Sequence, residues 1–282
     1  MAGRDLFGDG EIRLIVRCDD IGLNHATNQA FARVAREGIV TAASVMVTTP
    51  WLDEAVEILR DHPALDTGVH VCLNSEWWPY RWGPVTPADR VPSLVDEWGR
   101  FLPTRAAVKA RSPNHDEAER EMRAQVAAAQ CRGLTISYMD HHMLTIVADP
   151  GLRARFEAVG RSLGLALSGW FGERHGPAIY SAPPEKKAEV MIEGLRSLTE
   201  PGLYLVMAHP ALDEPEMRAL RDLNPDGLAD VARHRQAEME MLCDPRLREV
   251  IAERGIVLTG YTELRGRFLS HMATPALWRD LA

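Results

Sequence analysis

The stretch "IVRCDDIGLNHATN" (residues 15–28) places two adjacent acids, Asp19 and Asp20, directly after an apolar run. The apolar residues predict a buried strand, and the segment after the following glycine predicts the start of a helix. Two neighbouring carboxylates at a buried strand end repel each other and lose hydration. The stretch therefore predicts that a cation lies beside the two aspartates.

Strand and helix patterns alternate along the rest of the chain, which is typical of parallel sheets with right-handed crossovers. Apolar runs predict strands at 12–18, 43–48, 67–72, 135–140, 165–168, 203–208 and 256–259. Helical periodicity predicts helices at about 25–37, 51–61, 115–131, 150–163, 184–197, 227–243 and 246–254. We expect an α/β fold: a single-domain distorted (β/α) TIM-like barrel with about seven parallel strands, formed by residues 1–282. An open doubly wound sheet would give the same alternation.

Composition narrows the class of protein. The 282 residues are 46% hydrophobic and carry a formal net charge of -8, with no basic run, so we expect no nucleic-acid partner. No apolar stretch is long enough for a membrane span, and the N-terminal segment lacks the apolar core of a signal peptide. Four cysteines fit no disulfide framework, which favours a reducing compartment. We expect a cytoplasmic protein that does not bind membranes.

Polar side chains gather at four predicted strand ends, where parallel α/β folds bind their ligands. These residues are Asp19 and Asp20 after the first strand, His70 on the third, Asp140, His141 and His142 after the fourth, and His209 after the sixth. A lone histidine at a strand end is more often structural than functional. The convergence of four ends on acids and imidazoles is what indicates a site.

Two imidazoles and one carboxylate form a facial set for a divalent cation, with positions left open for water and substrate. A second carboxylate can take a proton from water, and His209 is placed to protonate a leaving group. His141 and His142 are adjacent on a strand, so at most one of them faces a shared site. Asp140 is expected to orient a neighbouring imidazole. The pattern is typical of metal-assisted hydrolysis.

A long segment without clear periodicity, residues 74–114, holds four of the seven tryptophans. Composition favours a hydrophobic flap over the core, and such long loops are often functional. The alternative is a wall that binds a sugar ring. The candidate substrate-binding residues in this segment are Glu76, Trp77, Tyr80, Arg81 and Trp82.

Five segments, in order along the chain, resemble the YdjC-like carbohydrate deacetylases, which include chitooligosaccharide deacetylases. They are "RCDDIGLNHATNQAFARVAREGIVTAASVMVTTPWLDEAV", "DTGVHVCLNSEW", "YMDHHM", "MAHPA" and "GIVLTGYTELR". The resemblance runs from the first strand nearly to the C-terminus. It implies a barrel-like α/β fold and removal of acetyl groups from N-acetylated sugars.

The resemblance also implies roles for individual residues. It places Asp20, His70 and His142 on one divalent metal ion, Mg²⁺ or Zn²⁺, with Asp19 as general base and His209 as general acid. It makes a homodimer plausible. The alternatives are another single-metal amidohydrolase, a phosphoesterase, or a catalytically silent sugar-binding protein.

The chain departs from the family pattern at three positions. Leu144 stands where many members have a second histidine, Ile21 replaces the usual aromatic residue, and Ala211 replaces the usual glycine. The change at Leu144 removes a polar contact near the site. It therefore puts the usual sugar substrate in doubt more than the three-ligand metal set, and we expect altered specificity.

Overall fold

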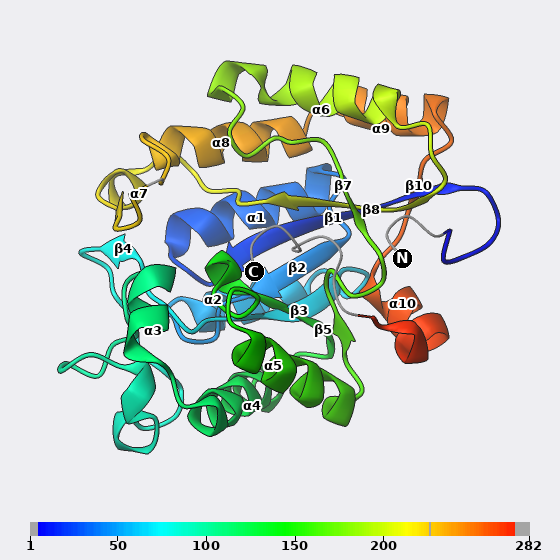
Figure 1. Cartoon of the computed structure of the whole chain (residues 1–282). Helices are drawn as coiled ribbons and strands as arrows, with labels where there is room; N and C mark the ends of the chain where they lie inside the picture. Colours follow the sequence, from blue (N-terminus) through cyan, green and yellow to red (C-terminus); the bar gives the residue numbers. More distant parts are fainter. Residues whose placement is uncertain (1–4, 226, 274–282) are drawn as a thin grey trace.

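The computed structural model describes residues 5–225 and 227–273, and its centre is a parallel sheet curled into a half-barrel (Figure 1). Seven strands form one continuous path in the order β6-β5-β3-β2-β1-β8-β7, and an eighth, β10, pairs with the start of β1. The strands are β1 (Ile12–Ile21), β2 (Ala42–Val45), β3 (Asp66–Val71), β5 (Ile136–His141), β6 (Ala166–Leu167), β7 (Arg174–His175), β8 (Gly202–Ala208) and β10 (Val257–Leu258). The predicted distorted TIM-like barrel with parallel strands is confirmed.

Helices pack around the curled sheet in two main groups. The larger helices are α1 (His25–Glu37), α2 (Leu52–Arg60), α4 (His115–Cys131), α5 (Pro150–Leu163), α6 (Lys187–Ser197), α8 (Val231–Leu242), α9 (Pro245–Glu253) and α10 (Tyr261–Phe268). Helices α1, α6, α8 and α9 contact one another along one side, and α4 packs against α5 on the other (Figure 1). Asn114 caps α4 by accepting from the backbone N–H groups of Asp116 and Glu117, as its position before Glu117 predicts.

The long segment 74–114 is less irregular than its sequence suggests. It contains β4 (Trp77–Trp78), two short 3₁₀ turns and α3 (Arg105–Arg111). Strand β4 pairs antiparallel with β9 (Arg221–Asp222), which follows the short helix α7 (Pro215–Arg218). Trp77 and Trp82 are buried, whereas Trp78 and Trp98 are exposed. The segment is thus anchored to the core by some of its tryptophans and joined to the region after β8.

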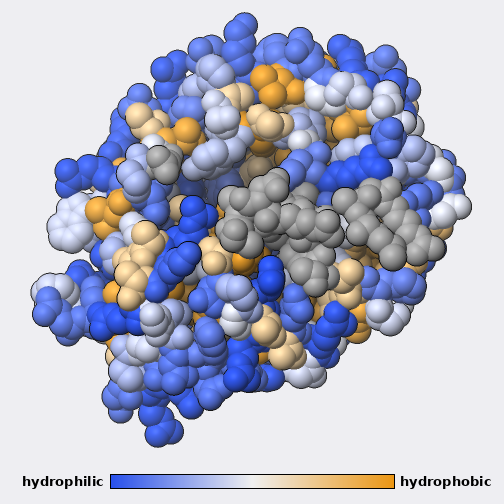
Figure 2. All heavy atoms as spheres, viewed as in Figure 1, coloured by the Kyte–Doolittle hydropathy of each residue, from blue (hydrophilic) through white to orange (hydrophobic). Residues whose placement is uncertain are grey.

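The core consists of apolar side chains from nearly every strand and from the inner faces of the helices. Ile21 ends β1 inside this core with no exposed surface, and Ala211 is also buried. The face shown in Figure 2 is mostly hydrophilic, with hydrophobic residues exposed in small groups. Among the residues that the structure describes, no helix combines the length and apolarity needed to cross a membrane.

Candidate metal centre

The two aspartates of β1 lie in a β-bulge. Cys18 pairs with Ala43 and Ile21 with Val45, so Asp19 and Asp20 together stand opposite the single residue Ser44. Asp20 adopts a left-handed backbone conformation with φ 65°, which is uncommon for a residue other than glycine. Bulges of this kind redirect side chains beside active sites. The bulge explains how two adjacent acids reach one site although strand neighbours normally point to opposite faces.

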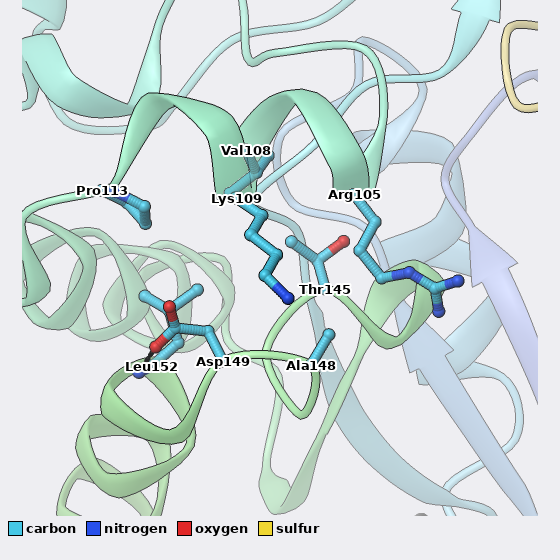
Figure 3. A pocket seen from close by; sticks show the side chains of 8 residues that line it. All are labelled: Arg105, Val108, Lys109, Pro113, Thr145, Ala148, Asp149 and Leu152. Carbon is cyan, nitrogen blue, oxygen red and sulfur yellow. Dashed lines mark hydrogen bonds between the residues drawn. The ribbon is translucent and has the colours of Figure 1, made fainter. Parts of the chain in front are cut away.

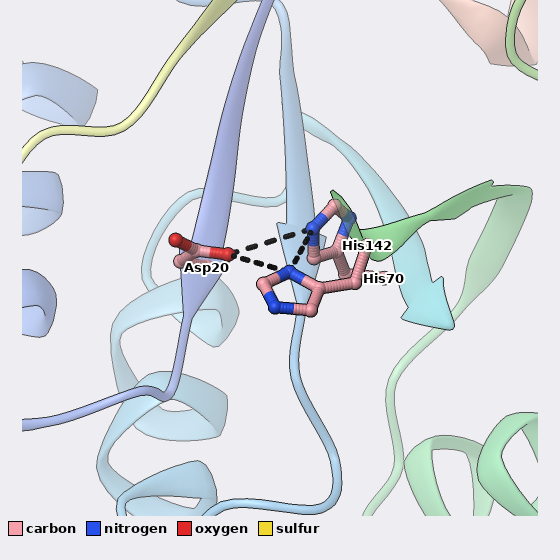
Figure 4. A group of neighbouring side chains, drawn as sticks. All are labelled: Asp20, His70 and His142. Atoms are coloured by element: carbon pink, nitrogen blue, oxygen red, sulfur yellow. Dashed lines mark hydrogen bonds and ion pairs between the residues drawn. The ribbon is translucent and has the colours of Figure 1, made fainter. Parts of the chain in front are cut away.

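Asp20, His70 and His142 converge at the carboxyl ends of β1, β3 and β5 (Figure 4). Asp20 Oδ1 lies 3.4 Å from His70 Nε2 and 3.4 Å from His142 Nδ1, and the two nitrogens are 3.2 Å apart. Ligand atoms about 2.1 Å from a shared ion stand about 3.0–3.4 Å from one another in octahedral or tetrahedral geometry. The three side chains therefore have the spacing that a small divalent cation requires.

Each of the three candidate ligands is held from behind by a charged partner. His70 Nδ1 lies 2.6 Å from Asp140 Oδ2, its register neighbour on β5, and His142 Nε2 lies 2.9 Å from both carboxylate oxygens of Glu76. A carboxylate only accepts, so these contacts place a proton on the outward nitrogen and leave the inward nitrogen free to bind a cation. The contact between Asp140 and His70 is the one that the predicted orienting role of Asp140 requires.

Glu76 is itself fixed by a short chain of hydrogen bonds. Asn74 Nδ2 donates to Glu76 Oε2 at 2.8 Å, and Thr145 Oγ1 donates to Asn74 Oδ1 at 2.6 Å. Thr145 also lines a small hollow between α3 and the start of α5 (Figure 3). The sequence predicts a substrate contact for Glu76, but its side chain is completely buried and directed at His142.

The turn after His142 is strained. Met143 and Leu144 are consecutive non-glycine residues with left-handed backbones, at φ 52° and 59°. Such conformations persist where the surrounding structure enforces them, commonly at functional sites. Leu144 packs partly buried against the core. At the position of the family's second histidine, this chain therefore has an apolar packing residue.

The centre of the site attracts positive charge. Burial alone would raise the pKa of Asp20, but Arg235 and His142 hold it well below its usual value. Burial also opposes charge on His142, yet the Glu76 and Asp20 carboxylates raise its pKa to about 10. Asp20 Oδ1 is buried and accepts no hydrogen bond from any described residue. A buried acceptor without a partner is costly, and a cation would satisfy it.

The buried charges around the site can be balanced by a divalent cation. The carboxylates in contact with the site are Asp19, Asp20, Glu76, Asp140 and Glu238, and their cationic partners are Arg17, Lys187 and Arg235. This set has two negative charges in excess, and the raised pKa values of His142 and His209 allow protons on their imidazoles to offset them. A divalent cation that replaced those protons would balance the same charge, so these residues fit a metal ion both in geometry and in charge.

Asp19 faces the same site but has a different partner. Arg17 Nε lies 2.6 Å from Asp19 Oδ1, and Arg17 Nη2 lies 2.7 Å from Oδ2, which makes a bidentate pair. The same Nη2 reaches Asp140 Oδ2 at 3.1 Å, and Nη1 donates to Ser168. Asp140, Asp19 and His70 also form a second group close enough to hold a cation, but Arg17 already supplies the positive charge there.

His209 stands on the open side of the site. Its Nε2 lies 3.9 Å from Asp19 Oδ2, and its Nδ1 lies 3.8 Å from Glu238 Oε2, with 22% of the side chain exposed. Burial opposes its protonation, but Glu238, Asp20 and Asp19 raise its pKa above the usual value. Glu238 is anchored by Lys187 Nζ at 2.9 Å. The structure thus brings His209 beside Asp19, where a proton donor can act.

The remaining candidate substrate residues surround this centre at different depths. The Trp82 ring lies edge-on to His142, with ring centroids 5.8 Å apart, and Trp77 lies under the guanidinium of Arg235 at 5.4 Å. Tyr80 donates its hydroxyl to the Leu23 carbonyl at 2.7 Å. Arg81 contacts Ser75 Oγ and the Phe101 carbonyl, so its polar atoms serve the loop itself.

Residues 13–253 match the YdjC-like protein family over most of the chain. The chain belongs to the YdjC-like family. A carbohydrate deacetylase from Thermus thermophilus is 30% identical over 266 residues, covering 85% of this chain and 89% of the relative. Another from Brevibacillus brevis is 26% identical over 273 residues, covering 90% and 100%.

A solved structure from Enterococcus faecalis, described as a candidate for cellobiose-phosphate cleavage, superposes with a TM-score of 0.75. It shares 24% identity and covers 90% of this chain and 99% of its own. This likeness shows that the YdjC-like chain has the same fold as that protein. It does not by itself assign an activity.

Three residues of this YdjC-like site were not anticipated from the sequence. Arg17 lies two residues before Asp19, and an arginine within an apolar strand next to an acid was the signal that could have identified it. Arg235 and Glu238 come from α8, and Arg235 contacts Asp20 across a separation of 215 residues. In a helix rich in charged residues, nothing in the sequence separates these two from solvent-exposed neighbours.

Proposed function

We propose that this YdjC-like protein is a metal-dependent hydrolase that removes the acetyl group from an N-acetylated sugar or oligosaccharide. The observation that supports it most directly is the buried Asp20–His70–His142 group, which has the Asp19–His209 pair beside it. The relatives named carbohydrate deacetylase support the same reaction class.

The roles follow from position and protonation. A divalent cation held by Asp20, His70 and His142 would supply Lewis-acid polarisation of the acetamide carbonyl and a more acidic water. Asp19, oriented by Arg17, accepts the proton from the attacking water. His209, whose raised pKa favours the protonated form, donates to the leaving nitrogen. Glu76 and Asp140 keep the two ligand imidazoles in the required tautomers.

The tryptophan-rich segment supplies the proposed sugar wall. Trp82 contacts the His142 ring and Trp77 lies beside Arg235, so both are within reach of a substrate at the centre. Tyr80 and Arg81 hold the loop through backbone and Ser75 contacts, and we assign them to its shape. For Glu76 we propose the positioning of His142 in place of a direct sugar contact.

One observation weighs against a two-metal phosphoesterase. Such enzymes hold two ions about 3.5–4 Å apart. The second group of possible ligands, Asp19, His70 and Asp140, shares His70 with the first and has Arg17 bound to both carboxylates. The guanidinium thus takes the place of a second cation.

The proposed function is tested by acetate release from a panel of N-acetylated sugars, with Mg²⁺, with Zn²⁺ and with a chelator. We expect release that the chelator abolishes and one metal restores, with one ion bound per chain. Sugar binding without acetate release would instead identify a catalytically silent binding protein. Two ions per chain would revive the phosphoesterase.

A further inference from the structure

Helix α8 presents two buried charged side chains to the site from one face. Arg235 and Glu238 are three residues apart, so they lie side by side on the helix surface. Their exposed fractions are 7% and 2%. Glu238 accepts from the His209 backbone N–H at 2.6 Å and from Lys187, so its oxygens are occupied. The guanidinium of Arg235, in contrast, still has an unpaired N–H donor.

One terminal nitrogen of Arg235 is used and the other is not. Nη2 donates to Asp20 Oδ2 at 2.7 Å, which leaves Asp20 Oδ1 for the histidine side of the site. Nη1 is buried and has no hydrogen-bond partner among the described residues. An arginine offers five N–H donors, and a buried one left unpaired costs stability unless a ligand meets it.

Two more unpaired donors lie nearby. Trp77 packs against the Arg235 guanidinium and Trp82 against the His142 ring, and the indole Nε1 of each is buried without a partner among the described residues. Buried tryptophan N–H groups usually find an acceptor. The walls of the site are thus rich in unpaired hydrogen-bond donors.

Two residues beside the site, Tyr180 and His209, are partly exposed to solvent. Tyr180 is 48% exposed, and its ring packs edge-on to that of His209 with centroids 5.8 Å apart. Burial raises the pKa of the Tyr180 hydroxyl, and the positive charge of Arg235 is close enough to oppose part of that rise. Arg235 therefore lies on the same side of the site as these two partly exposed residues.

We propose that Arg235 is a substrate-contacting residue: Nη2 fixes Asp20, and Nη1 donates a hydrogen bond to a neutral oxygen of the sugar. The proposal rests on the proposed deacetylase function and names a specificity residue for it. A hydroxyl or carbonyl oxygen is the acceptor, because these are the oxygens that a neutral N-acetylated sugar, the substrate of the proposed function, presents. Trp77, whose ring lies beneath the same guanidinium, supplies a second donor to the same ligand through its unpaired Nε1–H.

The experiment measures sugar binding without turnover. N-acetylglucosamine and N,N'-diacetylchitobiose are titrated calorimetrically into Asp19→Asn and into Asp19→Asn/Arg235→Lys, both with saturating Zn²⁺. Lysine keeps a positive charge opposite Asp20 but lacks the second terminal nitrogen. We expect sugar affinity to fall about 10- to 100-fold, as for loss of a charge-assisted hydrogen bond, and Zn²⁺ affinity to change less than about threefold.

Matched variants separate this role from a structural one. Arg233→Lys, on the exposed face of α8, should leave sugar affinity unchanged. Trp77→Phe removes only the indole N–H and should weaken sugar binding about 3- to 10-fold, whereas Trp98→Phe, at a 69% exposed residue, should not. Should Arg235→Lys fail to fold, Trp77→Phe still tests whether the buried N–H donors beside the site bind the sugar.

Several outcomes would overturn the inference. Equal sugar affinity in Asp19→Asn and in Asp19→Asn/Arg235→Lys would show that Arg235 does not contact the sugar. A parallel loss of Zn²⁺ and sugar affinity means that Arg235 acts only through Asp20. Tighter binding of a 6-phosphorylated sugar than of its neutral parent contradicts the neutral acceptor. If no sugar binds to Asp19→Asn and the wild type releases no acetate, the proposed function itself fails.

Discussion

The two sides of the site differ in how closely their side chains are held by neighbouring groups. On the proposed ligand side, the atoms of Asp20, His70 and His142 lie 3.2–3.4 Å apart, are buried, and each has a charged partner behind it. On the side proposed for proton transfer, His209 stands 3.9 Å from Asp19 and 3.8 Å from Glu238, with 22% of its side chain exposed. The proposed ligand side is thus preorganised, whereas the side chain of His209 is less closely held by its neighbours.

This difference implies that changes on the ligand side act through metal affinity, while changes on the proton side act on turnover with the metal in place. Preorganised groups give a large loss when removed because nothing nearby can replace them. A loosely held donor is partly replaced by water. Four variants test the comparison in order of expected effect.

The largest effect is expected for His142→Gln. This change removes an inward ligand nitrogen, so bound metal should be lost and acetate release should fall by about 1000-fold or more, since a metal contributes several kcal/mol to such reactions. Metal content and acetate release are measured on the same sample. His141→Gln is the control, because His141 packs on the other face of β5 against Phe156 and Trp170. Retained metal in His142→Gln would remove His142 from the ligand set.

Asp19→Asn should keep the metal and lose turnover. The amide can pair with Arg17 only through its oxygen and cannot accept the proton of water at neutral pH, so kcat should fall about 100- to 10,000-fold. Metal affinity by titration should stay within about threefold of the wild type. Full activity in this variant would show that another group is the base.

His209→Asn should lower kcat about 100-fold, because water replaces an exposed donor. The pH dependence gives a sharper test. A general acid must be protonated, and the raised pKa of His209 means that the wild-type rate is maintained through neutral pH and declines as pH rises past that pKa. The alkaline decline should disappear in the variant. An unchanged pH profile would exclude His209 as the donor.

Glu76→Gln should produce the smallest effect. The amide keeps the shape of the side chain but loses the charge that fixes the His142 tautomer, so metal affinity should fall about 10-fold while kcat at saturating metal changes little. Titration with Zn²⁺ and acetate release at saturating Zn²⁺ measure the two quantities. A large change in KM for sugar with unaltered metal affinity would indicate that Glu76 contacts the substrate.

Much of the fold could be predicted because hydrophobic periodicity marks long helices and buried strands. The predicted helices 25–37, 115–131 and 150–163 agree with α1, α4 and α5 to the residue. Short elements were missed: α10, α3, α7 and the two-residue strands β4, β7 and β9 are too brief to show a period. Their positions depend on tertiary contacts.

The site was predictable to the extent that it lies at strand ends. Asp20, His70, His142, Asp19 and His209 do come together in the structure. The bulge at Asp20 was not predictable, because only glycine commonly signals a left-handed residue in a strand and this one is an aspartate. Arg235 and Glu238 were hidden for another reason, since a helix pattern does not say which charged residues turn inward.

The position of β1 has a consequence for how the chain reaches its final state. This first strand pairs with β8 and β10, both from the last third of the sequence. Asp20 binds Arg235, which lies 215 residues later in the chain. During synthesis, the apolar β1 and its two acids are made before these partners exist. Long-range pairing of this kind is slow and exposes unpaired strand edges. The edge of β1 that pairs with β8 therefore has no partner until the last third of the chain has been made.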